Sequence, residues 1–143
     1  MNKDSIKLLQ ECSSGSKMGL NSINQVCEYV EDNTLMGVMN TYKKKHEDLE
    51  TKIGKYLQEN GQCEKEPGMM ASVFSQLTAD MKLMIKDDNH QIAKLMMNGC
   101  NMGIQSISKY VNEYNEASQE VQDLCEDLVK IEEDFMKDLK QFM

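Results

Sequence analysis

A segment near the start of the chain recurs 84 residues later, and this repeat constrains the fold more than any other feature. Residues 4–23 and 88–107 share six identities at that offset: Asp4 and Asp88, Gly15 and Gly99, Met18 and Met102, Gly19 and Gly103, Ser22 and Ser106, Ile23 and Ile107. Further along, an offset of 86 places His46 on Glu132 and Ile53 on Leu139. Such a repeat indicates two copies of one supersecondary unit, and neither copy buries its apolar face without the other.

Four long segments carry apolar residues in alternating steps of three and four, the spacing of helices that pack side by side in a bundle. They cover residues 3–31, 34–59, 89–114 and 116–142. The second segment has the seam Leu35, Met39, Tyr42, His46, Leu49, Ile53 and Tyr56. The fourth has the seam Val121, Cys125, Leu128, Glu132, Phe135, Leu139 and Phe142. Because the connection within each pair is short, we expect two antiparallel helical hairpins.

The connection between the pairs is much longer than a hairpin needs. It holds the only proline of the chain, Pro67, followed by Gly68. One face of its second part collects apolar residues at helical spacing, which predicts a short amphipathic helix: Met70, Val73, Phe74, Leu77, Met81 and Met84. We therefore predict one all-α domain over residues 1–143, with hairpins at 3–60 and 88–143 and a crossover at 61–87. Asp4 and Asp88 are the candidate N-caps, and Gly61 is placed to end the second helix.

Composition excludes several classes of function. The formal net charge is −8, and all sixteen basic residues are lysine, so nucleic acids and anionic membranes are poor partners. The first residues form no apolar leader, and no run of about 18 apolar residues occurs, which argues against a signal peptide and a membrane span. The five cysteines form no CxxC pair. Free thiols are typical of a reducing compartment, so we expect a cytoplasmic protein.

Four glycines lie inside the predicted helices at equivalent places in the two repeats: Gly15, Gly19, Gly99 and Gly103. Each costs about 1 kcal/mol of helix stability relative to alanine, so a packing reason is expected. One alternative is close approach of a neighbouring helix backbone. The other is a cavity between helices that holds a small apolar molecule or a cofactor.

Two hairpins, one long crossover and a twofold repeat resemble the ferritin-like superfamily, and the chain is similar to its small bacterial bundles. In iron-binding members, two helices carry a Glu and the other two a Glu-x-x-His motif, all facing inward. Here the residue three before His46 is Lys43, and the first and third helices offer no inward carboxylate at mid-depth. The resemblance therefore implies a degenerate member that keeps the fold without the di-iron ligand set.

His46 and Glu132 occupy seam positions where a bundle normally has leucine, and they are equivalent in the two repeats. One interpretation is a buried histidine–glutamate pair, or two side chains that reach the bundle edge, with no further role. The other is a residual metal site formed by His46 and Glu132, with Cys100 or Cys12 as a further ligand.

No nucleophile, acid–base pair or phosphate-binding loop stands in a recognisable context, so we predict a non-enzymatic protein with no cofactor. The first functional hypothesis is association with a protein partner, or formation of a homo-oligomer, through the Met-rich short helix. The alternative is a metal-binding or redox protein of the ferritin-like type that takes Fe, Mn or Zn at His46 and Glu132.

Overall fold

The computed structural model describes residues 1–64 and 88–143, and every regular element in them is helical. The long helices are α1 (Lys3–Val26), α2 (Asn33–Glu59), α4 (Asn89–Glu113) and α5 (Gln119–Leu139), with short 3-10 turns at Cys27–Tyr29 and Lys140–Phe142. None of these helices combines the length and apolarity needed to cross a lipid bilayer.

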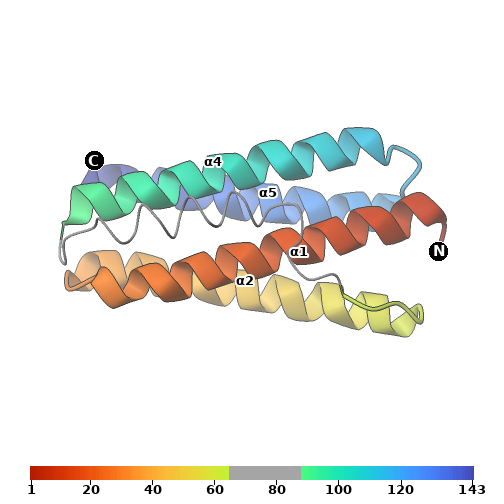
Figure 1. The fold of residues 1–143 in the computed structure, drawn as a ribbon, viewed down its shortest axis with the longest axis horizontal. Coiled ribbons are helices and arrows are strands. Elements are labelled where there is room, and N and C mark those ends of the chain that lie inside the picture. The colour runs from red at the N-terminus through yellow and green to blue at the C-terminus, as the bar shows by residue number, and fades with distance from the viewer. Residues whose placement is uncertain (65–87) are drawn as a thin grey trace.

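The four long helices lie side by side along the long axis of the molecule (Figure 1). α1 packs most extensively against α2, and α4 against α5, with the two helices of each pair antiparallel. α2 ends at the opposite end of the bundle from the start of α4, so these two run in the same direction (Figure 1). The prediction of an all-helical arrangement of four packed helices is confirmed. The short helix predicted at 70–84, with most of its crossover, lies outside the described residues.

Side-chain caps begin the four helices. Asp88 caps α4 as predicted, because its carboxylate accepts the backbone N–H of Gln91 at 3.1 Å. Asp4 does not cap α1: Asn2 does, accepting from the backbone N–H of Ser5 at 2.8 Å. Asp4 falls in the first turn instead and accepts the backbone N–H of Glu116, which joins the two hairpins at this end.

Gly61 ends α2 as predicted, with a φ of 68° that favours glycine. Its N–H reaches the carbonyl of Gln58, and the next N–H reaches that of Leu57, which together form a Schellman motif. The turn sends residues 62–64 back against α1. There the Gln10 amide donates to the Cys63 carbonyl at 3.1 Å, and Lys17 pairs with Glu64 at 2.8 Å.

In residues 1–64 and 88–143, the core consists of two apolar clusters, one towards each end of the bundle. The first includes Ile23, Leu35, Met39, Ile92 and Phe135, and the second includes Leu8, Ile53, Ile107, Val121 and Leu128. Each of the four long helices contributes to both clusters. On each long helix, the residues of one cluster are separated from those of the other by a gap near the middle of the helix. The candidate site lies at the level of this gap.

Candidate functional site

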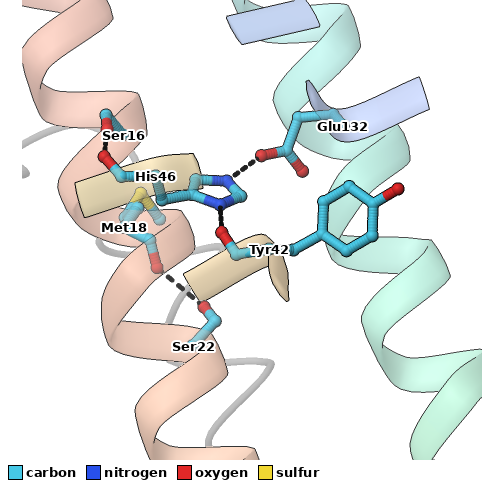
Figure 2. A network of polar contacts seen from close by, with 6 residues as sticks. All are labelled: Ser16, Met18, Ser22, Tyr42, His46 and Glu132. Carbon is cyan, nitrogen blue, oxygen red and sulfur yellow. Dashed lines mark hydrogen bonds and ion pairs between the residues drawn. The ribbon is translucent and has the colours of Figure 1, made fainter. Parts of the chain in front are cut away.

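His46 of α2 and Glu132 of α5 meet in the middle of the bundle, where Nε2 of His46 contacts Oε1 of Glu132 (Figure 2). His46 has no exposed surface, and Glu132 is 7% exposed. Both were singled out from the sequence as polar residues on apolar seams, and the structure brings them together. Burying either one alone would be costly, so the contact is what makes both positions tolerable. We call the two residues the central pair.

The hydrogen bonds of the imidazole fix how many protons the central pair holds. His46 Nδ1 lies 2.6 Å from the carbonyl oxygen of Tyr42, one turn earlier on α2 (Figure 2). A carbonyl oxygen only accepts, so Nδ1 carries a proton and donates it. Nε2 faces a carboxylate oxygen, and a single proton lies between them. The pair is thus an imidazolium with a carboxylate, or a neutral imidazole with a carboxylic acid.

Electrostatics favour the charged form of the central pair. Burial, the largest single influence, lowers the pKa of His46. The hydrogen bond and negative charge of Glu132, the Tyr42 carbonyl and the charge of Glu50 act in the opposite direction. Their sum exceeds the effect of burial, so the pKa of His46 is raised above its ordinary value of 6.5. The protonated form of His46 is therefore stabilised by these hydrogen bonds and negative charges rather than by water.

Gly19 of α1 makes room for the imidazole. A methyl group at this position would lie 2.8 Å from both Cδ2 and Nε2 of His46, closer than real contacts allow. Ser16, one turn earlier on α1, donates its hydroxyl to the backbone carbonyl of His46 at 3.3 Å (Figure 2). α1 thus supplies both the space for the ring and a hydrogen bond to the backbone that carries it.

The other three glycines of the repeat have different surroundings. A methyl group at Gly15 would meet Cδ1 of Ile107 at 3.2 Å, a tight contact. At Gly103 the nearest atoms belong to Glu132 at 3.9 Å, and at Gly99 nothing lies within 4 Å. The expected close approach is therefore found at two of the four positions. It is made by side chains of neighbouring helices rather than by helix backbone, which corrects the first interpretation.

Cys100 of α4 lies against the central pair, whereas Cys12 does not. The pKa of the Cys100 thiol is raised by burial first, and further by the charge and hydrogen bond of Glu132. Cys12 instead donates to the Leu124 carbonyl at 3.9 Å, and its pKa is raised first by contact with Cys125. In residues 1–64 and 88–143, no group of three or more His, Cys, Asp and Glu side chains is arranged to hold a metal ion. A metal role for His46 and Glu132 stays a prediction.

Aromatic packing supports the central pair from one side. Tyr42, which accepts from His46 through its carbonyl, stacks on Phe135 with ring centroids 4.5 Å apart. Its hydroxyl donates to Asp138 at 2.5 Å, and burial together with this hydrogen bond raises the pKa of Tyr42. α2 and α5 are therefore joined by both the polar pair and the stacked rings. The helical spacing placed Tyr42 and Phe135 on the seams, but nothing in the sequence signalled that they stack.

Over the residues that the structure describes, the fold and its centre define a class of protein: an all-helical bundle of four packed helices, with two apolar clusters separated by a buried histidine–glutamate pair. Comparison of the chain with protein-family models, with curated proteins and with solved structures gave no match.

Proposed function

We propose that the chain is a non-enzymatic helical bundle that acts by associating with protein, as another copy of itself or as a different chain. The observation that carries this proposal is how the polar groups of the core are used. The imidazole of His46 forms hydrogen bonds with Glu132 and with the Tyr42 carbonyl, and the Cys100 thiol forms one with Glu132. Because these groups satisfy one another, the core supports the fold, and the outer surface is left for function.

We further propose a ferritin-like origin. It is supported by the parallel course of α2 and α4, which matches a bundle with one long crossover. At mid-depth α1 presents Ser16 and Gly19, and α4 presents Cys100 and Gly103, so neither helix provides a carboxylate there. A fold that lost its di-iron ligands would carry such small residues in their place.

The described surface limits how association takes place. Its exposed large apolar side chains are Met1, Met102 and Met143, which do not form one broad patch along the sequence. Association through the described residues therefore depends mainly on polar and charged surface. The Met-rich segment at 70–84 lies outside the described residues, and its role as a docking face stays a prediction.

Light scattering of the full chain after size exclusion, at several concentrations, tests self-association. Chemical cross-linking in cells that express the protein, read by mass spectrometry, tests association with a different chain. We expect a species heavier than 16.4 kDa in the first experiment or one stoichiometric partner in the second. A monomer at every concentration that also cross-links to no protein in cells would contradict the proposal.

A second candidate function is binding of one metal ion at the central pair, because the imidazole of His46 and the carboxylate of Glu132 meet there and the Cys100 thiol faces the same carboxylate. The three side chains would have to rearrange around the ion, since they are not arranged to hold one as they stand. Nitrogen, oxygen and sulfur ligands of this kind suit Zn²⁺, which would replace the protons that now join them. Anaerobic titration with Zn(II), Fe(II) or Mn(II), read by native mass spectrometry, tests it. We expect one ion per chain, lost in His46→Ala and Cys100→Ser but kept in the control Cys12→Ser. Absence of stoichiometric binding at neutral pH would end this candidate.

A further inference from the structure

A groove with a volume of about 360 Å³ runs along the outside of the bundle between α4 and α5. We call it the acidic groove. Its lining includes Ser108, Val111, Asn112, Glu126, Val129 and Glu133. It lies against the C-terminal half of α4, and neither His46 nor Glu132 lines it.

Helical spacing places the lining residues on two facing stripes. On α5, Glu126, Val129 and Glu133 stand at intervals of three and four, so they share one face of the helix. On α4, Ser108, Val111 and Asn112 follow the same rule. The two valines are half-buried and form an apolar floor, which the fully buried Cys125 extends inward. The two glutamates are exposed and form the rim on the α5 side.

In the part of the chain that the structure describes, no basic side chain pairs with this rim. Lys130 also lines the groove, but its ammonium lies 3.4 Å from the carboxylate of Asp134, one turn further along α5. Within residues 1–64 and 88–143, neither Glu126 nor Glu133 takes part in an ion pair. α5 as a whole carries eight acidic and two basic residues, and only Glu132 of the acidic ones is buried. A ligand of this groove therefore meets a negative field.

We propose that the acidic groove binds an amphipathic helix of a partner protein, in which an apolar side chain is flanked by two basic residues seven positions apart. Glu126 and Glu133 are also seven residues apart, which is two turns or about 10 Å along a helix axis. A helix laid along α5 repeats that distance, so each basic side chain meets one glutamate. The apolar residues between them face Val111 and Val129. This inference rests on the proposed function and names the class of partner.

Charge and spacing favour this occupant over the alternatives. Nucleic acids and anionic lipid surfaces carry the same sign of charge as the rim, so they are repelled. A second copy of the chain offers its densest positive charge at residues 43–45 of α2, which are three consecutive lysines. Consecutive positions on a helix do not share a face, so this run does not match two glutamates two turns apart. Lysines seven residues apart do occur in the described residues, as Lys45 with Lys52 on α2 and Lys130 with Lys137 on α5. The exposed positions between them on the same faces are acidic, Asp48 in the first case and Glu133 in the second, so neither pair offers the apolar side chain that the groove floor requires.

The probe is a synthetic peptide of about 18 residues, designed as a helix with leucines on one face and lysines seven positions apart beside them. Fluorescence anisotropy follows its titration with the full chain, and amide chemical shifts locate the contact. We expect saturable one-to-one binding that shifts Val111 and Val129 and weakens between about 0.05 M and 0.5 M salt. The double variant Glu126→Lys/Glu133→Lys should bind about tenfold or more weakly, because two attractions become repulsions.

A matched control variant distinguishes binding at the groove from a general effect of the net charge of the protein. The variant Glu47→Lys/Glu59→Lys changes the net charge by the same amount at exposed positions of α2, and it should bind as the unmodified chain does. Equal weakening in both variants, or equal binding of a peptide whose lysine spacing is scrambled, would overturn the assignment. So would absence of binding at millimolar peptide. If light scattering or cross-linking still shows association, the proposed function stands without the groove.

Discussion

At the residue scale, two glycines occupy equivalent positions in the two repeats but have different neighbours. Gly19 faces the ring of His46, whereas Gly103 has only ordinary contacts with Glu132. Gly19→Ala forces the ring aside, and we expect a loss of about 1–3 kcal/mol in the free energy of unfolding. The gain of about 1 kcal/mol in helix propensity offsets part of the clash.

Gly103→Ala is the matched control, because it adds the same methyl group at the equivalent position without a close contact. We expect it to leave stability unchanged or to raise it by up to about 1 kcal/mol. Urea unfolding followed by circular dichroism measures both variants. A similar change of the same sign in the two would show that His46 does not occupy the space above Gly19.

The raised pKa of His46 predicts that stability depends on pH. The folded protein holds the imidazole proton more tightly than the unfolded chain, so the stabilisation is complete below about pH 6.5. It is lost as the pH rises through the folded-state pKa, by at most about 1.4 kcal/mol per pH unit for one proton. Urea midpoints between pH 6 and 8.5 measure this fall. The range stays below pH 9, because the pKa values of the Cys12 and Cys100 thiols are also raised in the folded protein. Ionisation of these thiols at higher pH would add a further fall in stability.

Glu132→Gln provides the control for the pH dependence. Without the carboxylate, burial becomes the dominant influence on His46 and lowers its folded-state pKa. The slope should then reverse, so that stability rises with pH through about 6.5. An unchanged slope in this variant would show that another group causes the pH dependence.

Part of the site was predictable from single residues. His46 and Glu132 stood out because a polar residue on an apolar seam needs a partner, and their equivalence in the repeat predicted that they meet. The unequal surroundings of Gly19 and Gly103 were not predictable. They depend on the size difference between an imidazole and a carboxylate after the helices have packed, and the repeat alone implies equal neighbours.

At the element scale, glycines inside and after α2 act in opposite ways. Gly37 lies exposed inside the helix, with nothing within 4 Å of an added methyl group. Gly37→Ala should therefore raise the free energy of unfolding by about 0.5–1 kcal/mol. Gly61 has a φ of 68° in the Schellman motif, so Gly61→Ala should lower it by about 1 kcal/mol or more. Thermal melting of the two variants should shift in opposite directions, and a shared direction would contradict this assignment of the helix end.

Helix ends and faces show where sequence patterns were sufficient. The seams of α2 and α5 agree with most of their buried residues. Leu57 rather than Tyr56 is buried at the end of α2, the seam of α5 missed the buried Leu124, and Phe142 beyond α5 is only partly buried. In the first helical segment, steps of three and four predict a seam that missed Leu8 and Cys12, which are fully buried. That seam consists of Ile6, Leu9, Ser13, Ser16, Leu20, Ile23, Cys27 and Val30. Buried positions there cover more than one face and include serines. Ser13 and Ser16 are buried at seam positions, as predicted. The burial of Ser5 and Ser14, which lie off the seam, depends on close packing that a hydrophobic pattern does not reveal.

At the scale of the whole molecule, the repeat and the seams predicted four packed helices, and the structure confirms that arrangement. Periodicity identifies which face of each helix turns inward, but not how four faces combine. The division of the core into two clusters follows from the central pair, which interrupts the apolar seams of α2 and α5 at the same level. Recognising that division requires knowing that α2 and α5 are neighbours, and this is a property of the assembled bundle.

The central pair also makes a prediction about the molecule as a whole. His46→Leu and Glu132→Leu each leave one buried polar partner alone, and each should cost about 3–5 kcal/mol at neutral pH. The double variant joins the two clusters into one apolar core, so it should recover this loss and can exceed the unmodified protein by about 1–4 kcal/mol. Urea unfolding of the three variants gives the coupling energy. If the double variant is no more stable than the weaker single variant, the two residues do not act as a pair.

A polar pair at one level also fixes helix register, because sliding either helix would separate the charges. Amide spectra of the double variant with broadened or doubled signals would show that this register control is lost even where stability is gained.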